Sequence, residues 1–286
     1  MGRRTRNYDF WLTREYGGAP VWMLIGVALV LVGVAWLALT RPPEPEYVAQ
    51  PRETPSETPS PTPTATVPLH PVVADFREWV AADSATTYFI AAGDSTRDDE
   101  GPAPFYFERL REDMPELPPE NIVSVGRNGA TLEWLLDDGG WLAEIEATTG
   151  ADGHAVVEIS VLTNDVRLGA LGTTVDEIEV AGSARLQEAI DALLALPNPP
   201  DIMLTVPAPY LVDGEYIEGV DPQVATEGVR AAFIAAAAAN PDVLFFDAQA
   251  ELFGTTTDRA FDGDQLHPGI TGQNELANAV AMILLG

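Results

Sequence analysis

Residues 72–286 alternate between short apolar runs and longer segments with helical periodicity. The runs are rich in β-branched and aromatic residues and lack the polar alternation of a half-exposed strand, so each predicts a strand buried on both faces. These runs are 86–92, 122–125, 155–162, 202–206 and 243–246. The helical patterns are 105–112, 131–136, 183–196, 225–239 and 273–285. Buried strands joined by helices predict an α/β fold, a three-layer α/β/α sandwich around a five-stranded parallel sheet.

An uncharged, almost wholly apolar stretch runs from residue 21 to residue 39. At about 1.5 Å rise per residue, such a helix nearly spans a hydrocarbon core of about 30 Å. We predict one transmembrane helix over residues 19–40 in preference to a cleaved signal peptide, whose apolar region is normally shorter. Four arginines precede the stretch, whereas Glu44 and Glu46 follow it. The positive-inside rule then places residues 1–18 in the cytoplasm and the remainder outside the cell membrane.

Residues 41–71 hold ten prolines among threonine, serine and glutamate. This composition cannot bury a core and predicts a disordered, extended stalk between the membrane and a domain over residues 72–286.

The chain has 15 Lys+Arg against 44 Asp+Glu, a formal net charge of −29, and no cysteine. Residues 1–71 contain six of each charge, so residues 72–286 carry nine basic against 38 acidic side chains. So strong a negative field repels a phosphate backbone, and we expect no nucleic-acid partner. The lack of cysteine excludes a thiol nucleophile, a disulfide scaffold and a cysteine-ligated metal.

Four polar loops follow predicted strands or lead to the last helix, and the carboxyl ends of parallel strands are where ligands gather. The loops contain Gly93-Asp94-Ser95, residues 126–131, Thr163-Asn164-Asp165 and Asp264-Gln265-Leu266-His267. A serine becomes a nucleophile when a base removes its proton, and histidine is the side chain best suited to this near neutrality. Of three histidines, only His267 has a carboxylate, Asp264, three residues before it. An oxyanion could be held by the N–H groups of Ser95 and Gly129 and by the amide of Asn164.

Gly93-Asp94-Ser95, Gly129, Asn164-Asp165 and Asp264-x-x-His267, in this order, resemble the SGNH (GDSL-type) hydrolase superfamily over residues 86–286. The resemblance implies a flavodoxin-like hydrolase fold that works without a metal or organic cofactor. It also implies the residue roles: Ser95 as nucleophile, His267 as base with Asp264 as its partner, Ser95, Gly129 and Asn164 as oxyanion donors, and Asp94 and Asp165 in support.

Two positions depart from the family pattern. Leu162 stands where the third block usually has glycine, and we expect it to add bulk beside the cleft and to forbid a glycine-only backbone angle. Thr96-Arg97-Asp98-Asp99-Glu100 follow Ser95, and this charged loop argues against an open apolar lipase groove. We expect Asp98, Asp99 and Glu100 to form a solvated acidic loop.

The leading hypothesis is a membrane-tethered extracytoplasmic serine esterase whose substrates are O-acetyl groups of envelope glycans or small acyl esters. One alternative is an acyltransferase that moves acyl groups onto glycan hydroxyls, because it needs the same nucleophile and oxyanion donors. Another is a non-catalytic binding module on the same fold. Taken singly, each block also has a purely structural interpretation: Ser95 as a helix cap, Asp94 and Asn164 as turn residues, Gly129 as a helix-start glycine, and Asp264 and His267 as a cap and a surface histidine.

Overall fold

The computed structural model describes residues 15–16, 19–20, 68–137, 140–209, 219–253 and 267–286 of the 286-residue chain. The chain divides into two compact units, Met1–Ala65 and Thr66–Gly286. In the first unit, strand β1 (Glu15–Tyr16) pairs antiparallel with β2 (Ala19–Pro20). Apart from β2, the membrane helix predicted over residues 19–40 lies outside the described residues, as does the predicted stalk up to residue 67. Where the structure is described, no helix is both long and apolar enough to cross a bilayer.

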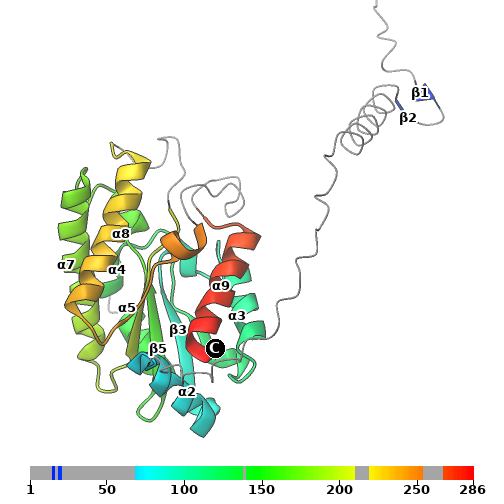
Figure 1. The fold of residues 1–286 in the computed structure, drawn as a ribbon, viewed down its shortest axis with the longest axis vertical. Coiled ribbons are helices and arrows are strands. Elements are labelled where there is room, and N and C mark those ends of the chain that lie inside the picture. Colours follow the sequence, from blue (N-terminus) through cyan, green and yellow to red (C-terminus); the bar gives the residue numbers. More distant parts are fainter. Residues whose placement is uncertain (1–14, 17–18, 21–67, 138–139, 210–218, 254–266) are drawn as a thin grey trace, which may run out of the picture. The chain divides into compact units, whose positions relative to one another are not determined.

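Five parallel strands form the sheet of the second unit (Figure 1) in the order β4-β3-β5-β6-β7. They are β3 (Thr87–Gly93), β4 (Ile122–Ser124), β5 (His154–Ser160), β6 (Asp201–Thr205) and β7 (Leu244–Phe246). The predicted α/β class and five-stranded parallel sheet are confirmed, since each apolar run contains one strand. The first strand of this sheet, β3, lies between the second and the third, so β3 and β5 flank the point where the strand order reverses, and ligands of open α/β sheets commonly bind at the carboxyl edge there.

Helices cover both faces of the sheet. Two buried apolar clusters, one on each face, join the strands to these helices. One face is covered by α4 (Leu132–Asp137), α5 (Gly140–Thr149), α7 (Val175–Leu194) and α8 (Pro222–Ala239). The other is covered by α2 (Pro71–Asp83), α3 (Pro104–Asp113) and α9 (Ile270–Leu285). Single turns connect these elements: 3-10 helices at Ser84–Thr86, Ser95–Arg97 and Pro119–Asn121, α6 (Thr163–Arg167), and a π-helical turn at Gln249–Phe253.

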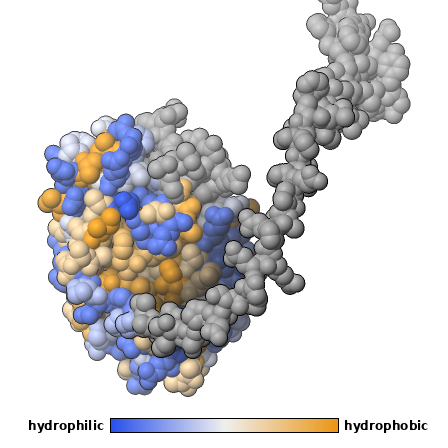
Figure 2. Space-filling view, viewed as in Figure 1, coloured by the Kyte–Doolittle hydropathy of each residue, from blue (hydrophilic) through white to orange (hydrophobic). Residues whose placement is uncertain are grey.

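The alternation of side chains along β3 explains why its sequence is apolar throughout. Ile90 and Ala92 belong to the cluster under α5 and α7, whereas Phe89 and Ala91 belong to the cluster under α2 and α9. A strand covered on both faces has no polar side, as its sequence predicts. In the view of Figure 2, hydrophobic residues gather across the middle of this unit and hydrophilic residues towards its ends.

Two helices, α2 and α5, do not correspond to any pattern singled out in the sequence. α2 begins at Pro71, in the segment whose composition predicts a stalk, and it buries only Val72, Val73 and Phe76. α5 begins at Gly140 and ends at Thr149, and three of its residues are buried. Glycine and threonine at the helix ends and a narrow apolar face make such a segment resemble a loop in sequence.

Candidate active site

Ser95 lies directly beyond the carboxyl end of β3, in the first position of a single 3-10 turn. Asp94 caps this turn, because its Oδ1 accepts hydrogen bonds from the Thr96 N–H at 3.0 Å and from the Thr96 hydroxyl at 2.9 Å. A side chain at Gly93 would collide with the Ser160 carbonyl of β5, so the strand end needs glycine. The chain therefore leaves β3 in a tight, buried turn that carries the Ser95 hydroxyl.

His267 approaches Ser95 from the opposite end of the domain sequence. Its Nε2 lies 2.8 Å from Ser95 Oγ, although the two residues are 172 positions apart in the chain. This is the distance of a hydrogen bond between a hydroxyl and an imidazole nitrogen. The structure thus brings the predicted nucleophile and base together. The predicted partner of His267, Asp264, lies outside the described residues.

Gly129 and Asn164 lie in two neighbouring loops that a hydrogen bond joins. Asn164 Nδ2 donates to the carbonyl of Ala130 at 2.9 Å. Gly129 adopts a left-handed backbone angle, φ 79°, and is exposed, with open space where a side chain would be. Asn164 is buried at the start of α6. The amide and the glycine turn are therefore held next to each other.

Asp165 of α6 also joins the segment that carries Gly129 to the segment that carries Asn164. Its carboxylate accepts the Leu132 N–H at 3.1 Å and faces the Arg185 guanidinium at 3.5 Å. Burial raises the pKa of Asp165 to about 6, and the bond from Leu132 and the charge of Arg185 partly offset this rise. Asp165 therefore ties the start of α4, just after Gly129, to the segment that carries Asn164.

Leu162 occupies a left-handed backbone conformation with φ 85° and ψ −7°, and it is the one non-glycine residue with a positive φ in the described part of the chain. The prediction that leucine forbids this angle is wrong. The side chain is fully buried and packs near Gly182 of α7, so its bulk lies in the core and not in the cleft. The left-handed residue turns the chain from β5 into α6, where the Leu162 carbonyl accepts the Val166 N–H at 3.0 Å.

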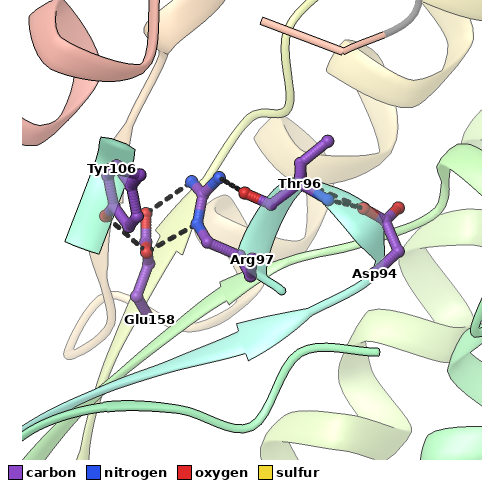
Figure 3. Close-up of polar contacts among 5 residues, drawn as sticks. All are labelled: Asp94, Thr96, Arg97, Tyr106 and Glu158. Carbon is purple, nitrogen blue, oxygen red and sulfur yellow. Dashed lines mark hydrogen bonds and ion pairs between the residues drawn. The ribbon is translucent and has the colours of Figure 1, made fainter. Parts of the chain in front are cut away.

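The charged loop after Ser95 is not solvated throughout, because the Arg97 side chain is only 1% exposed. Its guanidinium makes two bonds of 2.8 Å to the carboxylate of Glu158, one from Nε and one from Nη2 (Figure 3). The Tyr106 hydroxyl donates to the same carboxylate at 2.8 Å, and the guanidinium lies 4.6 Å from the Tyr106 ring centroid. Asp98 and Asp99, in contrast, are only partly buried, and Glu100 is exposed.

This buried ion pair shifts the pKa of its members. Burial acts to lower the pKa of Arg97, but the charge of Glu158 and the bonds to it raise that pKa overall. Burial and the negative charge of Glu158 raise the pKa of Tyr106 well above its usual value. This set was not predicted from the sequence, although a glutamate inside the largely apolar run 155–162 is a signal, because a buried carboxylate requires a partner.

The described residues contain no group of three or more histidine or acidic side chains placed to hold a metal ion. The geometry is that of an activated serine beside a histidine, with an amide and an open glycine turn nearby.

No family model matches this chain. No curated protein matches its sequence either. Several solved structures resemble it. A lipase/acylhydrolase from Enterococcus faecalis is 21% identical, covers 68% of this chain and 94% of its own, and has a TM-score of 0.47. The native M. smegmatis aryl esterase is 18% identical, covers 68% and 97%, and has a TM-score of 0.49. A carbohydrate acetylesterase family member from Sinorhizobium meliloti is 15% identical, covers 69% and 99%, and has a TM-score of 0.47.

All three names describe enzymes that hydrolyse esters.

Proposed function

We propose that this chain is a serine esterase that forms an acyl-enzyme on Ser95. The single observation that carries the proposal is the 2.8 Å contact between Ser95 Oγ and His267 Nε2. A serine hydroxyl is a weak nucleophile until a positioned base accepts its proton, and this contact places a base at the required distance. The SGNH-like order of the sequence motifs supports the same chemistry.

The reaction proceeds in two proton-coupled steps. Ser95 Oγ attacks the ester carbonyl carbon while His267 Nε2 takes the hydroxyl proton. His267 then gives this proton to the departing alcohol as its C–O bond breaks, which leaves an acyl group on Ser95. Water, deprotonated by His267, then attacks the acyl carbon. His267 returns this proton to Ser95 Oγ as the bond between Oγ and the acyl carbon breaks, which releases the acid and restores the serine. Asp264 is the proposed partner that orients the imidazole and stabilises its cation.

The oxyanion formed in each step needs hydrogen-bond donors. We assign this role to the backbone N–H groups of Ser95 and Gly129 and to Asn164. One N–H of the Asn164 amide donates to Ala130, and an amide nitrogen carries a second. Because Ser95 and Asn164 are buried whereas Gly129 is exposed, the substrate would enter from the side of Gly129.

The proposed substrates are O-acetyl groups on envelope glycans or other small acyl esters. The residues before Gly129, Arg127 and Asn128, are exposed and polar. This favours an ester of a polar alcohol, such as a sugar, over an ester with a long acyl chain. The apolar stretch 21–39 and the proline-rich segment after it support a domain tethered outside the membrane.

The test is the intact mass of the purified full chain after treatment with a fluorophosphonate. We expect one adduct on the parent and none on Ser95→Ala or His267→Ala. Ser183→Ala, on α7, is a control that should label fully, because its hydroxyl bonds only the Val180 carbonyl of its own helix. Full labelling of Ser95→Ala would refute the proposal. Release of acetate from acetylated sugars, compared with release of octanoate from an octanoyl ester, then tests the substrate class.

Membrane tethering is tested separately by cell fractionation. The full chain should sediment with membranes, and a chain lacking residues 1–40 should not. Equal sedimentation of both would contradict the anchor.

A further inference from the structure

Four residues with buried polar side chains are joined by a series of hydrogen bonds that leads from the Ser95 turn to the segment carrying His267. They come from the turn after β3, from β5, from α3 and from α9. Each is at most 3% exposed, and they are Arg97, Glu158, Tyr106 and Gln273.

Arg97 fixes the turn that carries Ser95. Its Nη1 donates to the Thr96 carbonyl at 2.9 Å, while Nε and Nη2 bond Glu158 on the neighbouring strand β5. Its own carbonyl accepts the Ser124 hydroxyl at 2.6 Å, from the end of β4. The Ser95 turn is therefore attached to both strands that flank β3.

Gln273 fixes the segment that carries His267. Its Nε2 donates to the carbonyl of Pro268, the residue after His267, at 2.7 Å, and to the Pro102 carbonyl at 2.8 Å. Because Gln273 belongs to α9, these two bonds attach the His267 segment to that helix and to the loop before α3.

Tyr106 links the two halves. Its hydroxyl donates to Glu158 at 2.8 Å, and its backbone N–H donates to Gln273 Oε1 at 3.2 Å. Hydrogen bonds thus lead from Thr96 through Arg97, Glu158, Tyr106 and Gln273 to Pro268, and both ends adjoin a residue of the reacting pair.

Stability of the fold alone is a weak explanation for these four buried polar residues. Removing two charges from water is costly, and apolar side chains of similar volume often replace a buried ion pair without loss of stability. Their place between the two reacting residues suggests a second role.

We propose that Arg97, Glu158, Tyr106 and Gln273 are positioning residues that hold the Ser95 hydroxyl and the His267 imidazole in register. This inference rests on the proposed function and deepens it. Small displacements of reacting groups cost a large share of the rate, so loss of the network should slow the chemical step and spare substrate binding.

Two variants test this without leaving a charge buried alone. Gln273→Met keeps the side-chain length and removes the bonds to Pro268, Pro102 and Tyr106. The double variant Arg97→Met with Glu158→Met replaces the ion pair by apolar side chains. Tyr106→Phe removes only one hydroxyl and serves as a milder third variant if either of these fails to fold.

The matched control is Asn121→Leu. Asn121 is also a buried amide, and its Nδ2 donates to the carbonyls of Ser84, Ala85 and Thr87 near the start of β3, far from Ser95. It removes several buried bonds and so reports the effect of lost stability alone.

The measurements are kcat and KM for p-nitrophenyl acetate, the rate constant of fluorophosphonate labelling, and the Tm of each full-length variant. We expect Gln273→Met and the double variant to lower kcat and the labelling rate about tenfold to a hundredfold, with KM within about twofold of the parent. Asn121→Leu should lower only the Tm. For Tyr106→Phe we expect a smaller loss of the same kind.

Folded variants that label at the parental rate would overturn the inference while leaving the proposed function intact. So would an equal loss of rate in Asn121→Leu below its Tm. A parent that forms no adduct at all would instead overturn the proposed function, and this inference with it.

Discussion

The left-handed backbone conformation of Leu162 is unfavourable, and the burial of its side chain offsets this cost. A left-handed conformation costs a non-glycine residue about 1–2 kcal/mol, and a fully buried leucine side chain contributes about 2–5 kcal/mol relative to alanine. The second effect is the larger, which explains how leucine can occupy a left-handed position that usually takes glycine.

Leu162→Ala keeps the strained angle and removes the packing, so we expect it to lower the free energy of unfolding by about 2–5 kcal/mol. Leu162→Gly removes the strain as well, and it should be less destabilising than alanine by about 1 kcal/mol. Urea denaturation of both variants measures the difference. An alanine variant as stable as the glycine variant would show that the positive φ is not maintained.

Asp201 provides a pH-dependent contribution to stability at the opposite edge of the sheet. Burial raises its pKa to about 6, the charge of Asp75 raises it further, and His70 and His154 oppose the rise. An aspartate whose pKa is raised on folding favours the folded state below its ordinary pKa of 3.8, and this contribution is lost as the pH rises through 6.

We therefore expect the change in the free energy of unfolding caused by Asp201→Asn to be more favourable at pH 7 than at pH 4. The difference should be on the order of 1 kcal/mol after discounting for partial exposure. Urea midpoints of parent and variant at both pH values give this difference. An equal change at both pH values would contradict the assignment. Asp165 also has a pKa near 6, so some pH dependence should persist in the variant.

At the residue scale, the contact between Ser95 and His267 was easier to predict from the sequence than its surroundings. Ser95 and His267 were predictable because their residue types and loop positions both matter for the chemistry. The partner of Glu158 was not, because Arg97 is 61 residues away and lies in a segment whose charges suggest solvent exposure. Only the fold brings the two together.

At the scale of elements, α7 and α8 pack closely through glycines. A Cβ built on Gly228 of α8 would lie 2.7 Å from Ile178 Cβ, which is closer than two carbon atoms can approach. Alanine is the better helix former by about 0.5–1 kcal/mol. Overpacking, however, costs about 1–3 kcal/mol and should prevail.

Gly228→Ala should therefore lower the free energy of unfolding by about 1 kcal/mol, the net of these two effects. Gly140→Ala is the control. Among the described residues, apart from its chain neighbours and its own helix backbone, no heavy atom lies within 4 Å of a Cβ built there, so this variant should not destabilise the chain. Thermal melts of both variants decide. Equal Tm values would indicate that the two helices move apart at no cost.

The strands were predictable to within one or two residues because their apolar runs are short and continuous, as in 202–206 against Asp201–Thr205. The helix α7 was predicted too short. Its first turn, with Asp176 and Glu177, is polar, and a capping box at Thr174 and Glu177 marks the true start. The capping signal was present in the sequence, but the apolar periodicity that guided the prediction begins later.

At the scale of the whole molecule, the negative charge is concentrated in residues 72–286, and most of it has no basic partner in the composition. Repulsion among like charges destabilises a compact state, and salt screens it over a Debye length of about 30 Å at 0.01 M and about 8 Å at 0.15 M.

We expect the Tm to rise when NaCl is increased from about 0.01 M to about 0.15 M. Differential scanning calorimetry of the full chain measures it. A fall would mean that exposed pairs such as Arg127–Glu144 and Arg109–Glu112 outweigh the repulsion.

The order of elements along the chain places the serine near the beginning of the domain and the histidine near its last described helix, so the two are synthesised at different times. Ser95 follows the first strand of the sheet, whereas His267 follows the last, and the histidine segment is held by α9 through Gln273. A nascent chain can pair all five strands and still lack its base until α9 has been synthesised and has docked. The reacting pair therefore assembles only after α9 has packed against the sheet, so the proposed enzyme has no positioned base until its tertiary structure is formed.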